Sequence, residues 1–130
     1  MKADLKFFRI IVSWLGVLLW CVTLWILSSI PGGKLPEVDV PNIDKFVHFG
    51  YFMAGAALLA NAFHQSTALS GRKLFLVVVA TVMLVGAADE IHQLFTPNRS
   101  GSDFGDWIAD VTGGVAGALI VGWFYGRRRK

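Results

Sequence analysis

The chain has 130 residues, of which 55% are hydrophobic and 16% are charged, and its mean hydropathy is +0.57. Soluble domains carry about 25% charged residues, so this composition excludes an ordinary soluble protein and indicates one membrane-embedded domain over residues 1–130. The net charge of +3 does not indicate a nucleic-acid partner, because the basic residues gather at the ends of apolar segments. A single cysteine, Cys21, excludes a disulfide within the chain.

The first two apolar segments are expected to cross the membrane as helices over residues 10–30 and 46–63. The first is long enough to span a hydrocarbon core, which takes about 20 residues, and it is long for a cleaved signal peptide. Pro31 and the two glycines after it end this helix. Asn42 or Asp44 is a candidate cap for the second helix, whose many small residues favour close packing in lipid.

The third and fourth spans are expected over residues 74–95 and 106–125. The third is apolar until Asp89, and Pro97 disfavours helix beyond it. Ser100-x-x-Asp103 is a capping-box pattern for the fourth span. Within that span, Gly113-x-x-x-Gly117 is typical of close helix–helix contact.

Four spans place both termini on one side of the membrane. Nine of the 12 basic residues lie on that side, in the leader, at Arg72-Lys73 and in the tail, whereas Lys34, Lys45 and Arg99 lie on the other. Positive residues favour the cytoplasmic side. The sequence therefore predicts an all-α integral membrane four-helix bundle with both termini cytoplasmic.

The acidic residues show the opposite bias. Eight of the nine lie on the side opposite the termini, where the second span begins, the third ends and the fourth begins. Ionisable groups at membrane depth are costly and usually mark functional sites. Helical spacing puts related residues on one face, for example Asp44 with His48. The candidate polar site consists of Asp44, Lys45, His48, Asp89, Glu90, His92, Gln93, Arg99, Asp103, Asp106 and Asp110.

Structural explanations compete with a functional site. Asp103 and Asp106 could cap the fourth helix, where acids are favoured by the helix dipole. Arg99 could anchor the chain at the lipid headgroups. A closed network, in which Arg99 neutralises at least one buried carboxylate, would satisfy the adjacent acids Asp89 and Glu90 without any ligand.

Several blocks of this sequence together resemble the VanZ-like membrane proteins. The resemblance covers the second to fourth spans and implies a small helical protein of the bacterial cytoplasmic membrane, from a family linked to resistance against the glycopeptide teicoplanin. It departs from many members at Asp110, where they carry asparagine. The matching blocks are Asp44-Lys45-x-x-His48-Phe49-x-Tyr51-Phe52, Asp89-Glu90-x-His92-Gln93, Pro97-x-Arg99 and Asp106-x-x-x-Asp110-x-x-Gly113-x-x-x-Gly117.

Three functions remain open from the sequence. The first is binding of a lipid-linked or other envelope molecule at the outer face. Arg99 and Lys45 would hold a phosphate or carboxylate, and sugar or amide groups would bond to Asp89, Glu90 and Gln93. The second is an enzyme with His48 as general base oriented by Asp44 or Asp89, or a hydrolase or transferase assisted by Zn or Mn on His48, His92 and carboxylates. The third is a proton-linked transport accessory that oligomerises through its glycine faces. We expect membrane lipids and an envelope molecule as partners, no nucleic acid, no cofactor and no compact metal-ligand spacing.

Overall fold

The structure is a computed structural model that describes residues 2–32, 40–99, 101 and 103–127. Over these residues it contains helices and no strand. Each helix is long and apolar enough to cross a membrane, which confirms the predicted all-α, four-helix membrane fold. The helices are α1 (Lys2–Ser28), α2 (Ile43–Ser66), α3 (Gly71–Gln93) and α4 (Phe104–Arg127).

Helix boundaries differ from the predicted ones where turns compete with the helix. The basic leader is helical, so α1 begins well before residue 10. α3 ends at Gln93 and not at residue 95, because the next N–H groups bond three residues back: Phe95 to the His92 carbonyl and Thr96 to the Gln93 carbonyl, both at 3.0 Å. Such bonds tighten the end of a helix, and they replace the bonds to the fourth residue back that would continue the α-helix.

The helix starts are capped only in part as expected. Asn42 precedes α2 with a left-handed backbone (φ 57°), and its side chain makes no capping hydrogen bond. Asp44 lies inside the first turn and bonds Lys45 instead. The Asp103 carboxylate accepts the N–H of Gly105 at 2.7 Å and so caps α4. Ser100, the other half of the expected capping box, lies outside the described residues.

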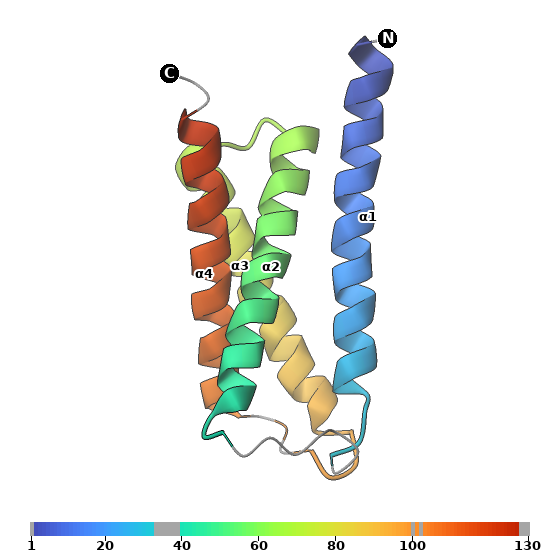
Figure 1. Cartoon of the computed structure of the whole chain (residues 1–130), viewed down its shortest axis with the longest axis vertical. Coiled ribbons are helices and arrows are strands. Elements are labelled where there is room, and N and C mark those ends of the chain that lie inside the picture. Colours follow the sequence, from blue (N-terminus) through green and yellow to red (C-terminus); the bar gives the residue numbers. More distant parts are fainter. Residues whose placement is uncertain (1, 33–39, 100, 102, 128–130) are drawn as a thin grey trace.

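The helices stand roughly side by side and alternate in direction (Figure 1). The start of α1 and the end of α4 therefore lie at the same end of the molecule, which we call the terminal end. The other end, called the polar end below, gathers the end of α1, the start of α2, the end of α3 and the start of α4. This arrangement brings the acidic residues of three helices into one region.

The closest helix pair is α2 with α4. A Cβ built on Gly113 would lie 2.2 Å from the Phe49 carbonyl oxygen, and one on Gly117 would lie 2.2 Å from that of Met53. Only a residue without a side chain fits against a neighbouring backbone at this distance. The predicted packing role of these glycines is thus realised within one chain, and oligomerisation stays a prediction.

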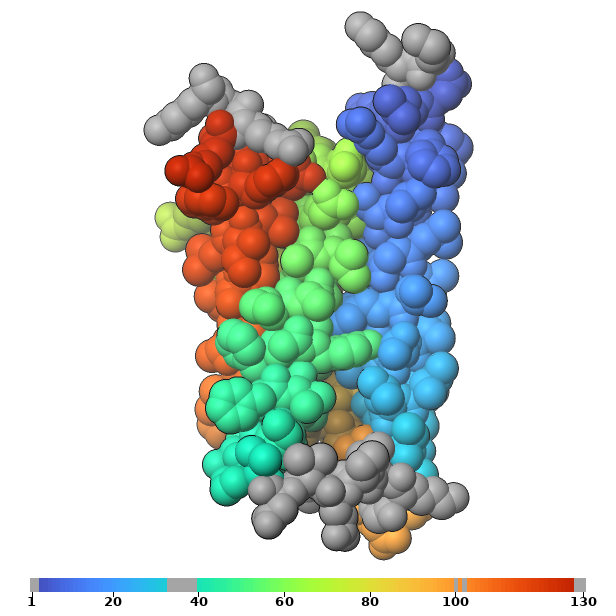
Figure 2. All heavy atoms as spheres, viewed as in Figure 1, coloured from blue at the N-terminus to red at the C-terminus, as the bar shows by residue number. Residues whose placement is uncertain are grey.

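α1 packs more loosely than the other helices. It meets α2 through Trp20, which is buried in the middle of the span and whose indole occupies the space left by Gly55. Most other large apolar side chains of α1 are exposed, as expected for a surface that faces lipid. In Figure 2 the molecule is hollowed at the terminal end between α1 and α4, where α2 forms the floor.

Candidate functional site

The polar end holds a group of charged residues contributed by α2, α3 and the start of α4. Their side chains face one another because the small residues of α4 allow it to lie close to both neighbours. A small residue of α3 contributes as well, since a Cβ on Gly86 would lie 2.8 Å from the Asp110 carboxylate. We call this group the acidic cluster; it consists of Lys45, His48, Glu90, Asp103, Asp106 and Asp110.

Lys45 is the cation of the acidic cluster. Its Nζ lies 2.9 Å from Asp106 and 3.1 Å from Asp103, and it also pairs with the exposed Asp44 at 3.2 Å. The hydrogen bond from this ammonium lowers the pKa of Asp103 below its ordinary value. One lysine thereby ties the first turn of α2 to the first turn of α4.

His48 is oriented by Asp110. The His48 Nδ1 lies 2.9 Å from Oδ1 of Asp110, whose side chain has no exposed surface. This contact turns the other ring nitrogen, Nε2, toward Asp106, whose Oδ2 is 4.0 Å away. The expectation that Asp44 or Asp89 orients His48 is wrong, because both carboxylates bond other groups.

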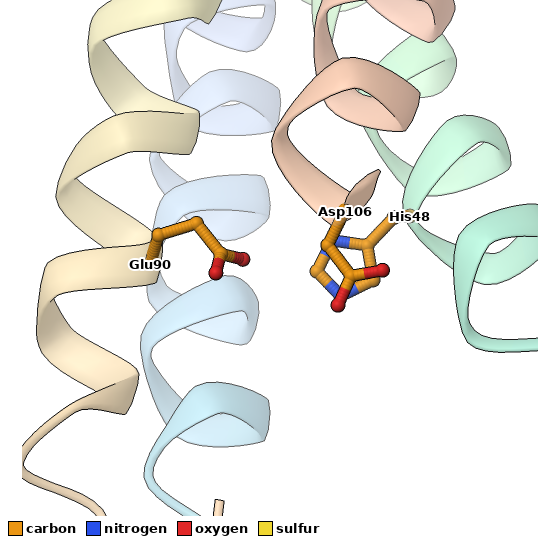
Figure 3. Close-up of side chains that lie close together, drawn as sticks. All are labelled: His48, Glu90 and Asp106. Atoms are coloured by element: carbon orange, nitrogen blue, oxygen red, sulfur yellow. The ribbon is translucent and has the colours of Figure 1, made fainter. Parts of the chain in front are cut away.

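Glu90 enters the acidic cluster from α3. One of its carboxylate oxygens accepts the backbone N–H of Asp103 at 2.7 Å, while the other is buried and has no hydrogen-bond partner among the described residues. The side chain points across the bundle toward His48 and Asp106 (Figure 3). One potential ligand atom from each of these three residues lies within 4.8 Å of the other two.

Asp89, the neighbour of Glu90, belongs to a separate network with α1. Its carboxylate accepts hydrogen bonds from Ser28 and, at 2.9 Å, from the Gln93 amide. His92 also faces α1, where it contacts the Ser29 hydroxyl and stacks on an indole ring. His92 therefore does not join His48, contrary to the expected ligand set. The sequence reasoning missed the α1 partners, for which the only signal was a pair of serines at the end of an apolar run.

Arg99 also serves α1. Its guanidinium donates to the carbonyls of Leu27 at 2.8 Å and Ile30 at 3.2 Å. Within the described part of the chain no ion pair joins it to a carboxylate, so the expectation that Arg99 neutralises a buried acid is wrong. The reason is that the last carbonyls of a helix are unpaired and carry partial negative charge, which attracts a cation.

Two pockets open beside these groups. One, of about 340 Å³, lies between α3 and α4 and is lined by Ala87, Glu90, Ile91, Asp103, Phe104 and Trp107. It combines two carboxylates of the polar end with apolar walls. The other, of about 180 Å³, lies on the α1 side and is lined by Cys21, Leu24, Trp25, Val85, Ala88, Asp89 and His92.

The comparisons with known proteins give one match. A search of curated proteins and a search of solved structures each found nothing similar. A family model described as VanZ/LLP1 matches residues 3–125, which include α2, α3, nearly all of α1 and α4, and every residue of the acidic cluster. The expected family is confirmed by a match over nearly the whole chain. This chain therefore belongs to the VanZ/LLP1 family of membrane proteins.

Proposed function

We propose that this protein resides in the bacterial cytoplasmic membrane and binds an amphipathic molecule of the cell envelope at its polar end. The observation that carries the proposal is the composition of the larger pocket. Phe104, Trp107 and Ile91 give it walls suited to a lipid chain, while Glu90 and Asp103 present hydrogen-bond acceptors to a head group. Sites for small molecules generally combine apolar lining with a few placed polar groups.

The charges of the site narrow the chemistry of the head group. Arg99 is engaged with α1, and the ammonium of Lys45 already contacts three carboxylates. The protein thus has little positive charge to offer a phosphate directly. Hydroxyl and amide groups, which donate hydrogen bonds to carboxylates, suit the site better. A lipid-linked cell-wall precursor carries sugar and peptide groups of this kind, and the resemblance to proteins linked to teicoplanin resistance supports the same class of molecule.

The proposal requires the polar end to face outward. We expect this orientation because most basic residues lie at the terminal end, and basic residues favour the cytoplasmic side. In a chain with Cys21 replaced by serine, we expect Ser100→Cys to react with a membrane-impermeant thiol reagent added to whole cells. Lys130→Cys should react only after the cells are opened. Labelling of Lys130→Cys in intact cells, or protection of Ser100→Cys, would contradict the orientation.

Filling the larger pocket with a bulky side chain tests whether the proposed ligand binds there. Ala87 lines it, and a tryptophan there would occupy space that a lipid chain needs. Ala80 lies on the same helix but is exposed to lipid, so Ala80→Trp is the matched control. We expect Ala87→Trp, but not the control, to lose photo-crosslinking to a lipid-linked wall precursor and to lose protection against teicoplanin in a susceptible host.

Phosphatidylglycerol serves as the second probe in this experiment. If it crosslinks as well as the wall precursor and equally in both variants, the labelling reports bulk lipid. Equal crosslinking of the precursor to both variants would show that the pocket between α3 and α4 is not the binding site.

A further inference from the structure

We propose that His48, Glu90 and Asp106 form a binding site for a divalent transition-metal ion, of which Zn²⁺ is the best match. The three residues come from three different helices, α2, α3 and α4, so the sequence contains no short motif that would predict the site. One imidazole and two carboxylates are a donor set that Zn²⁺ accepts, whereas Mg²⁺ and Ca²⁺ prefer oxygen alone. This site stands on its own geometry and does not depend on a lipid ligand.

The distances are close to those of a tetrahedral site. With metal–ligand bonds of about 2.0–2.1 Å, two ligand atoms on tetrahedral Zn²⁺ lie roughly 3.4 Å apart. The His48 Nε2 and the Asp106 Oδ2 are 4.0 Å apart, and the ligand atoms of all three residues lie within 4.8 Å of one another. Small side-chain rotations would complete the site. Three protein ligands leave a fourth position open.

The burial of Glu90 independently supports a cation at this position. The residue is 6% exposed, and one of its carboxylate oxygens is buried without a hydrogen-bond partner among the described residues. The side chain is directed at His48 and Asp106 (Figure 3). A buried acceptor without a donor costs free energy, and a cation placed between these three groups would remove that cost.

The outer contacts of the ligands also fit a metal. A histidine that binds metal through one ring nitrogen generally donates the other N–H to a carboxylate, which fixes the ring. Asp110 holds Nδ1 of His48 in this way at 2.9 Å. Asp106 is held by Lys45 through Oδ1, so that Oδ2 is the oxygen nearest His48. Both candidate ligands are therefore oriented by neighbours before any ion arrives.

A second group of acids must be distinguished from this site. Asp44, Asp103 and Asp106 also lie within 4.8 Å of one another. Asp44 is exposed, and all three already share the ammonium of Lys45. This group offers oxygen alone and has no buried acceptor left without a partner among the described residues, so the features that favour Zn²⁺ at His48 are missing there.

The test is Zn²⁺ binding to the purified, chelator-treated protein in detergent, measured by calorimetry with no envelope lipid added. We expect one Zn²⁺ per chain for the wild type and for Asp44→Asn. His48→Gln and Glu90→Gln should each weaken binding by more than the roughly 10–100-fold that loss of an outer hydrogen-bond partner costs. Asp110→Ala, which removes such a partner, should fall within that range.

X-ray absorption of the Zn²⁺-loaded wild type keeps the proposal testable if a variant fails to fold. We expect a shell of oxygen ligands with one imidazole. An all-oxygen shell, or loss of binding in Asp44→Asn with retention in Glu90→Gln, would place the ion at the outer acids and overturn the proposal. Absence of stoichiometric Zn²⁺ binding by the wild type would also overturn it, and would leave the proposed lipid function untouched.

Discussion

Replacing Gly117 by leucine is expected to separate α2 from α4 and to lower the melting temperature of the protein sharply. Overpacking a core typically costs 1–3 kcal/mol, and we expect about 3 kcal/mol or more, because the new side chain meets a backbone carbonyl that cannot rotate away. The ideal Cβ would lie 2.2 Å from the Met53 oxygen and 3.0 Å from the Ala56 side chain. Thermal unfolding in detergent, followed by intrinsic fluorescence, measures the effect.

Gly122→Leu is the matched control for this prediction. It lies on the same helix and changes helix propensity in the same way, but a Cβ there meets nothing within 4 Å. We expect its melting temperature to stay near that of the wild type. If the melting temperatures of Gly117→Leu and Gly122→Leu fall equally, α2 and α4 do not pack through the glycine face.

Removing the positive charge of Lys45 is the second change with a large expected effect. Lys45→Met keeps most of the apolar stem but leaves Asp106, whose side chain is 9% exposed, without its cation. Unpairing a buried charge costs about 3–5 kcal/mol and an exposed one about 0–1, so we expect about 2–3 kcal/mol for this half-buried lysine. Adding Asp106→Asn should recover a large part of the lost free energy of unfolding, because it removes the unpaired charge.

A double-mutant cycle with Arg99→Met gives the control. Arg99 contacts the carbonyls at the end of α1 and none of the carboxylates of the acidic cluster. Its coupling to Asp106 should be close to zero, whereas Lys45 and Asp106 should couple by about 1 kcal/mol or more. A strong coupling of Asp106 to Arg99 in unfolding experiments would show that the cation of the site has been assigned to the wrong residue.

The fold was largely predictable because its signals are long. Four apolar segments with short polar connections can satisfy their backbone groups in lipid only as helices. The spacing of Gly113 and Gly117 predicted a close interface, although not the identity of the partner helix. The first residues of α1 and the last turn of α3 were misjudged because their boundaries depend on local hydrogen bonds. Hydropathy does not detect such bonds.

The candidate site was predictable as a region but not as a set of pairs. Both Lys45 and Arg99 lie near the acids in sequence, and only the packing of α1 decides that Arg99 turns to its carbonyls. The pairing of His48 with Asp110 depends on the space left by Gly86. A glycine within an apolar segment does not indicate that a carboxylate packs against it. Residue type shows which groups need partners, whereas chain topology decides which partners they meet.

The two acids Asp89 and Glu90 acquire their partners at different moments of synthesis. Chains emerge from the N-terminus, so we expect Ser28 of α1, which donates to Asp89 in the folded protein, to be available when α3 is inserted. Glu90 accepts its hydrogen bond from the backbone of Asp103, which is made later. Until that segment is made, the Glu90 carboxylate lacks this donor. The last helix to be inserted thus completes the surroundings of Glu90, by supplying the hydrogen-bond donor that the first three helices do not provide.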